Sequence, residues 1–534
     1  MTHSSTGNFI EKPLGASGKG IQKKLSSVVR SDQISIQWPD RLSYGRDCSS
    51  KGILWVKEGK VPYPPQWILW PESTQEVSRI VSFANEEGLP LIPFGGGSGV
   101  CGGTWALKGG ITLDLKRMDQ ILEVDTRKMV VRVQSGMNGE LLERELNRRG
   151  LTLGHFPSSI YAATVGGYMA CRSAGQFSSL YGKIEDMTVG LQVVLADGKI
   201  VDVGSVQDRP QTLDLKEIFL GSEGTLGVLT EGTFKVHPRP EEQIFLGFQF
   251  RNIEKGIRAA REIMQRGLRP SVLRLYDPLD SMLANSYKED PDEKEESFLS
   301  KALAKILNPA LTGARNYSLK MALKKAKLAK GFLDFLPGQC LMILGFEGSS
   351  GLVPHQAAHA DRLCRELSGK SMGEGPGRYW FKHRYSVSYK LSHLFDEGFF
   401  ADTLETATTW KNLPNLYHMV RDAIGKHALV MAHFSHSYPE GCSIYFTFLG
   451  YREDPKVSRK LYDQIWREAL NAVVHAGGTI SHHHGIGVLK AGHMPKEWGE
   501  AFEWLCKLKR ELDPNNVMNP GKLGFPEDWE SERT

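Results

Sequence analysis

A glycine-rich loop that directly follows an apolar run constrains this chain more than any other feature. Residues 89–94, LPLIPF, predict a buried strand, and the glycine loop at 95–99 follows without a spacer. Adjacent glycines let the backbone approach a ligand closely, and their N–H groups can surround an anion. The loop matches neither GxGxxG at the start of a helix nor GxxxxGK[ST], which disfavours a nicotinamide-binding Rossmann site and a Walker loop. Taken alone, such a loop can equally be an ordinary turn.

The segments around this loop predict both strands and helices. Residues 67–70, WILW, have the short apolar pattern of a strand. Residues 73–88 predict an amphipathic helix, which Ser73 can cap. A hairpin is predicted over residues 187–203, because an Asp-Gly pair divides two alternating runs. Strands and helices do not alternate regularly, so we expect an α+β fold.

Length and composition bound the class of protein. The chain has 534 residues, 40% hydrophobic and 24% charged, which predicts a soluble globular protein with two large or three smaller domains. A net charge of +5 is too small on this length to indicate nucleic acid. No apolar run reaches the roughly 18 residues of a membrane-spanning helix. The first thirty residues are basic and rich in Ser and Gly, so we expect a disordered tail without a secretory signal.

The seven cysteines are scattered and include no CxxC pair. This pattern favours a reducing cytoplasm over a disulfide framework or a thiolate zinc site. We therefore expect a cytoplasmic protein. The cysteines are Cys48, Cys101, Cys171, Cys340, Cys364, Cys442 and Cys506.

Two further stretches give the glycine loop a context. Residues 154–175 carry small residues against which a flat ring can lie, and residues 221–231 form a second glycine-rich turn into a strand. An NPGKL ending follows near residue 520. In this order and spacing the stretches resemble the FAD-binding flavoproteins of the vanillyl-alcohol oxidase (PCMH-type) superfamily. The resemblance covers roughly residues 60–525.

This resemblance implies a two-subdomain, PCMH-type FAD-binding domain followed by an α+β substrate-cap domain. The implied ranges are 1–60 for an N-terminal tail and leader segment, 61–240 for the FAD-binding domain, 241–525 for the FAD-linked oxidase C-terminal or cap domain, and 526–534 for a tail. Some members attach FAD through a His in the glycine loop, and this loop has none, so we expect non-covalent FAD. The implied FAD-binding residues form four stretches: Pro93, Phe94, Gly95, Gly96, Gly97, Ser98 and Gly99; Pro157, Ser158, Ser159, Ile160, Tyr161, Ala162 and Ala163; Ala170, Cys171, Arg172 and Ser173; and Glu223, Gly224, Thr225, Leu226, Gly227, Val228 and Leu229.

A run of three histidines at 482–484 narrows the choice within the superfamily. Relatives that oxidise D-2-hydroxy acids carry Glu-His-Gly where this chain has SHHHG. Together with SVLRLYD, TLETATTW and GCSIYFTF, the run resembles the alkyldihydroxyacetonephosphate synthase family. That family exchanges the acyl group of acyl-dihydroxyacetone phosphate for a fatty alcohol in ether-lipid synthesis, without net redox change.

Matching positions imply a role for several side chains. Tyr445 would be the acid/base, the three histidines would bind and polarise the head group, and His155 would lie near the flavin. Arg274 would face the substrate. The phosphate-binding Arg of the family aligns near Lys390, where this chain has no Arg, and Arg384 lies six residues earlier. The implied catalytic residues are therefore Tyr445, His482, His483, His484 and His155, and the implied substrate-binding residues are Arg274, Arg384 and Lys390.

Other interpretations stay open on the sequence alone. The three histidines can form a metal site with His433 and His436, although no carboxylate or Cys spacing supports one, or they can be a structural loop. An FAD oxidase or dehydrogenase of a 2-hydroxy acid or alcohol would use the same histidines and Tyr445 to take a proton. A third class is a flavin-binding protein without catalysis. A Lys-rich amphipathic helix predicted at 318–333 allows peripheral membrane contact, and the family allows a homodimer.

Overall fold

The computed structural model describes residues 16–204, 214–285, 320, 323–324, 338–385, 395 and 398–526. Lys390 and most of the stretch 318–333 lie outside these residues. The chain forms two compact units, of which the first comprises Met1–Gly175, Gly182–Arg239 and Ser481–Thr534. The second comprises Gln176–Tyr181 and Pro240–Ile480. The first unit therefore includes the residues from Ser481 on, which the resemblance assigned to the cap domain.

A four-stranded sheet in the first unit carries the glycine loop. Its strands are β1 (Ile34–Ser35), β2 (Trp67–Leu69), β4 (Ile111–Asp114) and β3 (Leu91–Phe94) in spatial order, and β4 runs parallel to both β2 and β3. Helix α4 (Thr74–Glu86) begins after Ser73, whose hydroxyl accepts a hydrogen bond from the N–H of Glu76. This confirms the predicted cap. The apolar face of α4 packs in one core with the strands.

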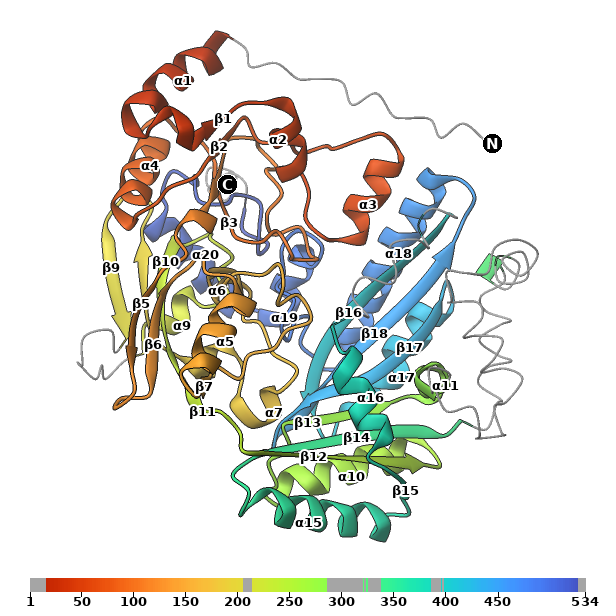
Figure 1. Cartoon of the computed structure of the whole chain (residues 1–534). Coiled ribbons are helices and arrows are strands. Elements are labelled where there is room, and N and C mark those ends of the chain that lie inside the picture. Colours follow the sequence, from red (N-terminus) through yellow and green to blue (C-terminus); the bar gives the residue numbers. More distant parts are fainter. Residues whose placement is uncertain are drawn as a thin grey trace, which may run out of the picture. The chain divides into compact units, whose positions relative to one another are not determined.

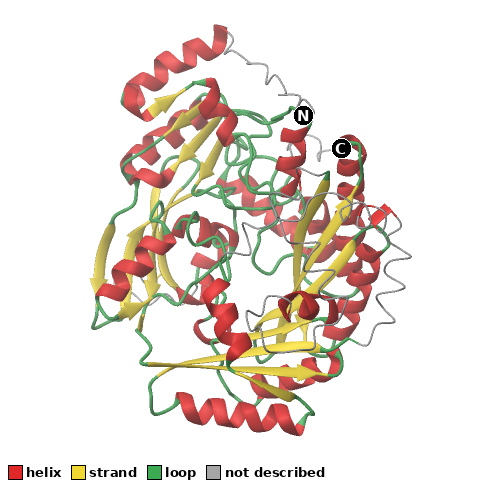
Figure 2. Ribbon diagram, turned by 45° about the vertical axis from the view of Figure 1, so that its right-hand side comes forward, coloured by secondary structure: helices red, strands yellow, loops and turns green. Residues whose placement is uncertain are grey.

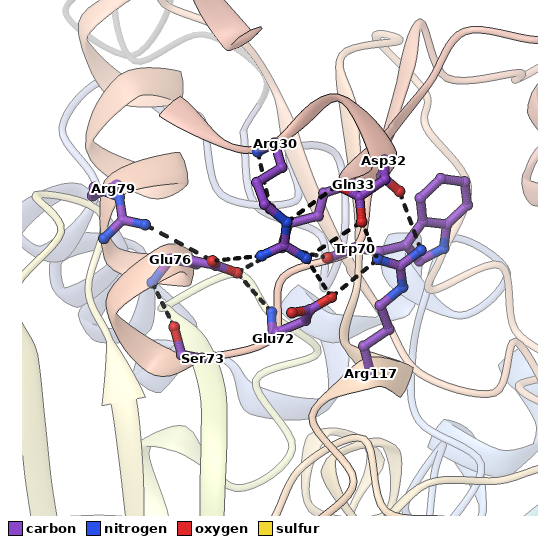
Figure 3. Close-up of polar contacts among 9 residues, drawn as sticks. All are labelled: Arg30, Asp32, Gln33, Trp70, Glu72, Ser73, Glu76, Arg79 and Arg117. Carbon is purple, nitrogen blue, oxygen red and sulfur yellow. Dashed lines mark hydrogen bonds and ion pairs between the residues drawn. The ribbon is translucent and has the colours of Figure 1, made fainter. Parts of the chain in front are cut away.

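Helix α1 (Ala16–Val28) corrects the expectation of a disordered N-terminal tail. Leu25 and Val29 lie one helical turn apart and are buried in the same core as α4. Figure 3 shows the polar contacts beyond the helix, where Arg30 donates to Glu72 Oε1 at 2.8 Å and Arg117 donates to the same oxygen at 3.2 Å. Ile21 and Val28 of the same segment also pack on this core, so its apolar residues hold it in place although its composition is basic and rich in Ser.

A second, five-stranded sheet of the first unit is antiparallel throughout. Its order is β5 (Ile121–Asp125), β6 (Val130–Gln134), β10 (Val228–Lys235), β8 (Thr188–Val194) and β9 (Ile200–Gly204). Helix α6 (Val165–Cys171) packs on β10 (Figure 1). Strands β8 and β9 confirm the predicted hairpin, and Gly198 at its turn has φ +85°, a conformation that suits glycine.

Shorter elements complete the first unit. The C-terminal segment pairs with β3, because the N–H of Leu91 donates to Val517 O at 2.8 Å and the N–H of Asn519 donates to Leu91 O at 2.9 Å. The remaining helices and strands are α2 (Trp38–Tyr44), α3 (Ser50–Lys57), α5 (Gly139–Arg148), α8 (Ile184–Met187), α9 (Lys216–Phe219), α19 (Met494–Trp498), α20 (Ala501–Leu512), and β7 (Leu151–Thr152) paired with β11 (His237–Pro238). Short 3-10 helices occupy Ser31–Gln33, Leu115–Arg117 and Ala491–His493.

The second unit is built on a seven-stranded antiparallel sheet. In spatial order the strands are β15 (Lys370–Gly373), β12 (Glu242–Phe250), β14 (Cys340–Gly348), β13 (Val272–Tyr276), β17 (Leu429–Ser437), β18 (Gly441–Tyr451) and β16 (Phe399–Thr409). Helices α10 (Ile253–Gln265), α15 (Val353–Glu366), α17 (Leu413–Gly425) and α18 (Pro455–His475) pack on the sheet (Figures 1 and 2). The fold class is therefore α+β, as predicted.

The register of the strands separates the two faces of this sheet. Leu275 pairs with Phe434, and their side chains point to the face where α10 and α17 pack. Arg274 and Tyr276 point to the opposite face, because side chains alternate along a strand. That second face also meets α16 (Gly375–His383), whose Phe381 packs on Phe245 of β12. We refer to it below as the Arg274 face.

Two short helices of the second unit lie beside strand β13. Helix α7 (Ser178–Tyr181) contacts β13 and β17, and α11 (Pro278–Asn285) follows β13 directly. None of the helices within the described ranges has both the length and the apolar character needed to cross a bilayer. All seven cysteines are free thiols.

Candidate functional site

The first two predicted FAD stretches lie against each other in the first unit. A Cβ added to Gly95 would overlap the hydroxyl of Thr164, and one added to Gly96 would overlap the carbonyl oxygen of Ala162. Only glycine permits the backbone of the loop to approach these two groups so closely. In contrast, a Cβ at Gly99 would meet nothing within 4 Å, so the far end of the loop borders open space.

The third and fourth stretches join the same cluster. The N–H of Glu223 donates to Ala170 O at 3.0 Å, which links the fourth stretch to the third. A Cβ at Gly224 would lie 2.7 Å from the ring of Pro93, so the fourth stretch also packs on the first. The structure therefore brings the four stretches together, although they are up to about 130 residues apart in sequence.

His155 lies against the third stretch as a buried, neutral imidazole. Its Nε2 is 2.7 Å from the Ser173 hydroxyl, and burial lowers its pKa to about 3. Its Nδ1 is buried and has no hydrogen-bond partner among the residues described, and the same holds for the hydroxyl of Ser222 beside the fourth stretch. Unpartnered buried polar atoms next to a glycine cradle fit a bound polar cofactor such as FAD.

The three histidines occupy a bent loop of the first unit rather than a strand. His482 Nδ1 and His483 Nδ1 are 3.1 Å apart, so one nitrogen carries the shared proton and the other accepts it. The ring centroids of His483 and His484 are 4.5 Å apart. Within the same loop, the hydroxyl of Ser481 donates a hydrogen bond to Gly485 O at 3.0 Å. The predicted cluster is thus a chain of three adjacent imidazoles, joined by a hydrogen bond and by a ring contact.

Glu223 connects this loop to the fourth FAD stretch. Its carboxylate accepts from the N–H of Ile486 at 2.5 Å and from the N–H of Gly487 at 2.9 Å. Burial raises the pKa of Glu223 to about 7, against the opposing effect of these bonds and of the nearby Lys522 and Lys490. The side chain predicted to contact FAD therefore holds the backbone that follows the three histidines.

In the second unit, four side chains form a row across four adjacent strands of the Arg274 face. The register pairs Tyr276 with His433, His433 with Tyr445, and Tyr445 with Glu405. Directly opposed residues of an antiparallel pair lie on the same face of the sheet. Tyr445, which was predicted as the acid/base, is thus a member of this row, and Arg274, which was predicted as a substrate ligand, lies beside it over the ring of Tyr276.

Tyr445 is held as a neutral phenol. Its hydroxyl donates to Thr403 Oγ1 at 2.9 Å, and its ring stacks on that of His433 with centroids 4.9 Å apart. Burial raises its pKa to about 12, whereas the hydrogen bond with Thr403 and the positive charge of Arg274 act to lower it. Tyr445 can therefore serve as a proton donor at neutral pH.

Arg274 and His433 form a hydrogen-bonded group with Asp280. Arg274 Nη2 is 2.6 Å from His433 Nε2, and His433 Nδ1 is 3.0 Å from Asp280 Oδ2. Sequence reasoning assigned His433 only to an alternative metal site with His436, and it missed Asp280. Both ring nitrogens of His433 are engaged by protein groups, and His436 bonds instead to the Ser178 hydroxyl at 2.7 Å, so this metal alternative is disfavoured.

The predicted Arg384 lies apart from this group. Its guanidinium packs on the rings of Phe381 and Tyr385, and its Nη1 donates to Phe381 O at 2.6 Å. No contact joins it to Arg274 or His433 in the part of the chain that the structure covers. Lys390, the other predicted substrate ligand, is not among the described residues.

Comparisons with known proteins agree with this geometry. Residues 239–523 match the family model described as FAD linked oxidases, C-terminal domain, and residues 65–204 match that described as FAD binding domain. An alkyldihydroxyacetonephosphate synthase from Dictyostelium discoideum is 29% identical over 518 residues, which cover 94% of this chain and 80% of that protein. The glycolate oxidase subunit GlcD of Bacillus subtilis is 27% identical over 508 residues, which cover 93% of this chain and 97% of that protein.

A solved structure of an alkyldihydroxyacetonephosphate synthase is also similar. It matches with a TM-score of 0.74 at 27% sequence identity and covers 96% of this chain and 86% of that one. The likeness therefore extends through both compact units.

Proposed function

Since the chain belongs to the family of FAD-linked oxidases, we propose that it is an FAD-containing enzyme of the alkyldihydroxyacetonephosphate synthase type. The observation that carries this proposal is the likeness to such a synthase over 94% of the chain. FAD is the cofactor, and the four converging stretches of the first unit would hold it. Because the glycine loop contains no His, we propose that FAD is bound non-covalently.

In the proposed reaction a fatty alcohol replaces the acyl group of acyl-dihydroxyacetone phosphate. The bond between the head-group carbon and the acyl oxygen breaks, and the fatty acid leaves with the electron pair of that bond. A new carbon–oxygen bond forms to the alcohol, whose proton is released, so no electrons are gained or lost overall. Bound FAD supplies the ring that activates the head-group carbon.

The side chains of this protein would move the proton and bind the head group. The neutral phenol of Tyr445 would exchange a proton with the carbon next to the carbonyl, and Arg274 lowers the energy of its ionised form. His482, His483 and His484 would contact the carbonyl and phosphate oxygens, since imidazole N–H groups donate hydrogen bonds to such acceptors. The cation of Arg274 complements the phosphate charge.

The second candidate is a redox enzyme, an FAD-dependent oxidase or dehydrogenase of a 2-hydroxy acid or alcohol. The likeness to a glycolate oxidase subunit over 93% of the chain favours it. In this case Tyr445 and the histidines would take the hydroxyl proton of the substrate. Anaerobic addition of D-2-hydroxy acids would then bleach the yellow flavin, whereas a synthase would keep its colour.

The decisive experiment supplies the FAD-loaded protein with acyl-dihydroxyacetone phosphate and radiolabelled hexadecanol. We expect a labelled ether lipid, and a Tyr445→Phe variant with normal flavin content should form it at least about a hundredfold more slowly. Absence of labelled product from the wild-type enzyme, together with bleaching by a hydroxy acid, would establish the second candidate instead.

We also propose that the enzyme works at a membrane surface on the cytoplasmic side. Both proposed substrates carry long alkyl chains that partition into bilayers, and free thiols suit a reducing compartment. The full-length protein should co-sediment with vesicles that contain acidic phospholipid at low salt. Recovery of all the protein in the supernatant would contradict this location.

A further inference from the structure

Arg274 is a cation whose charge no carboxylate contacts directly among the described residues. Its guanidinium carbon lies over the rings of Tyr276 and Trp380, 5.3 Å and 6.0 Å from their centroids. Its Nε is buried and has no hydrogen-bond partner within the described ranges. A buried donor without an acceptor lowers the stability of the folded protein. The geometry therefore indicates that a ligand supplies this acceptor.

The hydrogen bonds around His433 determine its tautomer. A guanidinium has only donors, so the 2.6 Å contact from Arg274 Nη2 requires a lone pair on His433 Nε2. The ring proton is then on Nδ1, which donates to Asp280 Oδ2 at 3.0 Å. Burial and the charge of Arg274 both lower the pKa of His433 well below its usual value, which agrees with a neutral ring.

Asp280 is itself held in place by the start of helix α11. Asp277 precedes Pro278, the first residue of this helix, and its carboxylate accepts from the N–H of Asp280 at 2.9 Å. This is the usual position of a capping side chain. The imidazole of His433 is also stacked on Tyr445, so both its position and its rotation are defined.

We propose that Asp280 and His433 form a positioning pair that presents Arg274 to an oxyanion of the substrate. Under the function proposed above, on which this inference rests, the oxyanion is the head-group phosphate. The ionised carboxylate orients the imidazole, the imidazole accepts from Nη2, and Nε remains to donate to a phosphate oxygen. The carboxylate stabilises the cation through the ring without occupying the place of the phosphate.

The test compares variants of His433 in the FAD-loaded, full-length enzyme. His433→Phe keeps a ring beside Tyr445 but removes the acceptor for Arg274 and the donor for Asp280. His433→Gln restores both, because its amide has one oxygen and one NH₂ group. The control is His427→Phe, which breaks another His–carboxylate contact, that of His427 Nε2 with Glu468 on α18 at 2.9 Å.

Three quantities are measured: the dissociation constant of dihydroxyacetone phosphate by calorimetry, and KM and kcat for ether-lipid formation. For His433→Phe we expect the dissociation constant and KM to rise roughly tenfold to a hundredfold, with a smaller change in kcat. His433→Gln should recover to within about threefold of the wild type, and His427→Phe should equal the wild type. Should His433→Phe fail to fold, Asp280→Asn serves instead and should weaken binding by about threefold to tenfold.

Two results would overturn the inference. The first is a folded, flavin-loaded His433→Phe or Asp280→Asn variant that binds dihydroxyacetone phosphate as tightly as the wild type. The second is a variant that loses affinity for D-lactate but not for dihydroxyacetone phosphate, which would make the oxyanion a carboxylate. If the wild type forms no ether lipid, the proposed function fails, whereas the binding measurement still tests the positioning pair.

Discussion

Glu223 illustrates how much one side chain contributes to the candidate site. It sits at φ +50°, and its carboxylate accepts from two consecutive N–H groups beyond the three histidines. Asn519 donates to its carbonyl oxygen at 2.7 Å, so the fourth FAD stretch, the histidine loop and the C-terminal segment meet at this residue. Its protonation therefore affects the stability of the whole junction.

Replacing Glu223 with Gln should change how stability depends on pH. Glu223 has a folded-state pKa raised to about 7, so between pH ~4.5 and 7 the folded protein keeps a proton that the unfolded chain releases. The wild type should lose stability as pH rises through this window, by up to about 3 kcal/mol from this group. Gln cannot titrate, yet its oxygen can still accept both N–H groups. In urea unfolding, the free energy of unfolding of the variant relative to that of the wild type should be higher at pH 7.5 than at pH 5. The same difference between the two proteins at both pH values would contradict the raised pKa of Glu223.

At the scale of elements, the sequence pattern predicted those helices, strands and turns that depend on contacts between neighbouring residues. Strand β3, the cap of α4 and the β8–β9 hairpin follow from neighbouring residues, and all three are confirmed. In the Arg274–His433–Asp280 group, His433 is 159 positions from Arg274 and 153 positions from Asp280 in the sequence. Such a contact depends on strand register, which a single sequence does not encode locally.

Gly96 and Gly99 of the glycine loop should respond differently to substitution with Ala, which adds a methyl group. Gly96→Ala places its Cβ against the Ala162 carbonyl, so the apoprotein should lose about 1–3 kcal/mol of unfolding free energy. Gly99→Ala meets open space and should leave apoprotein stability unchanged while weakening FAD binding. Apoprotein melting and flavin titration separate these effects. Equal melting temperatures for the two apoprotein variants would show that the close backbone contact at Gly96 does not affect stability.

At the scale of the molecule, the chain leaves the first unit at Arg239 and re-enters it at Ser481. The returning segment is buried structure rather than a tail. Val517 and Met518 are 2% and 0% exposed, and they share a core with Leu91 and Ile111. Lys509, also fully buried, donates to Thr225 O at 2.8 Å. The first unit therefore cannot complete its core without the last part of the chain.

A truncation after Ile480 should abolish FAD binding. It removes the partners of Glu223, the segment beside β3 and the buried Lys509, all of which lie within the first unit. We expect an insoluble or colourless protein, as judged by absorbance near 450 nm. The matched control ends after Pro526, retains every contact described above and should stay yellow. A yellow product from the shorter chain would contradict this dependence.

The returning segment also sets an order of events during synthesis on the ribosome. Residues 240–480 emerge, and can fold, before the nascent chain contains the residues that close the first unit. Until then, strand β3, which carries the glycine loop, lacks its hydrogen-bond partner at Val517. We therefore expect incorporation of the flavin to be a late step, which follows synthesis of the segment from Ser481 to Pro526.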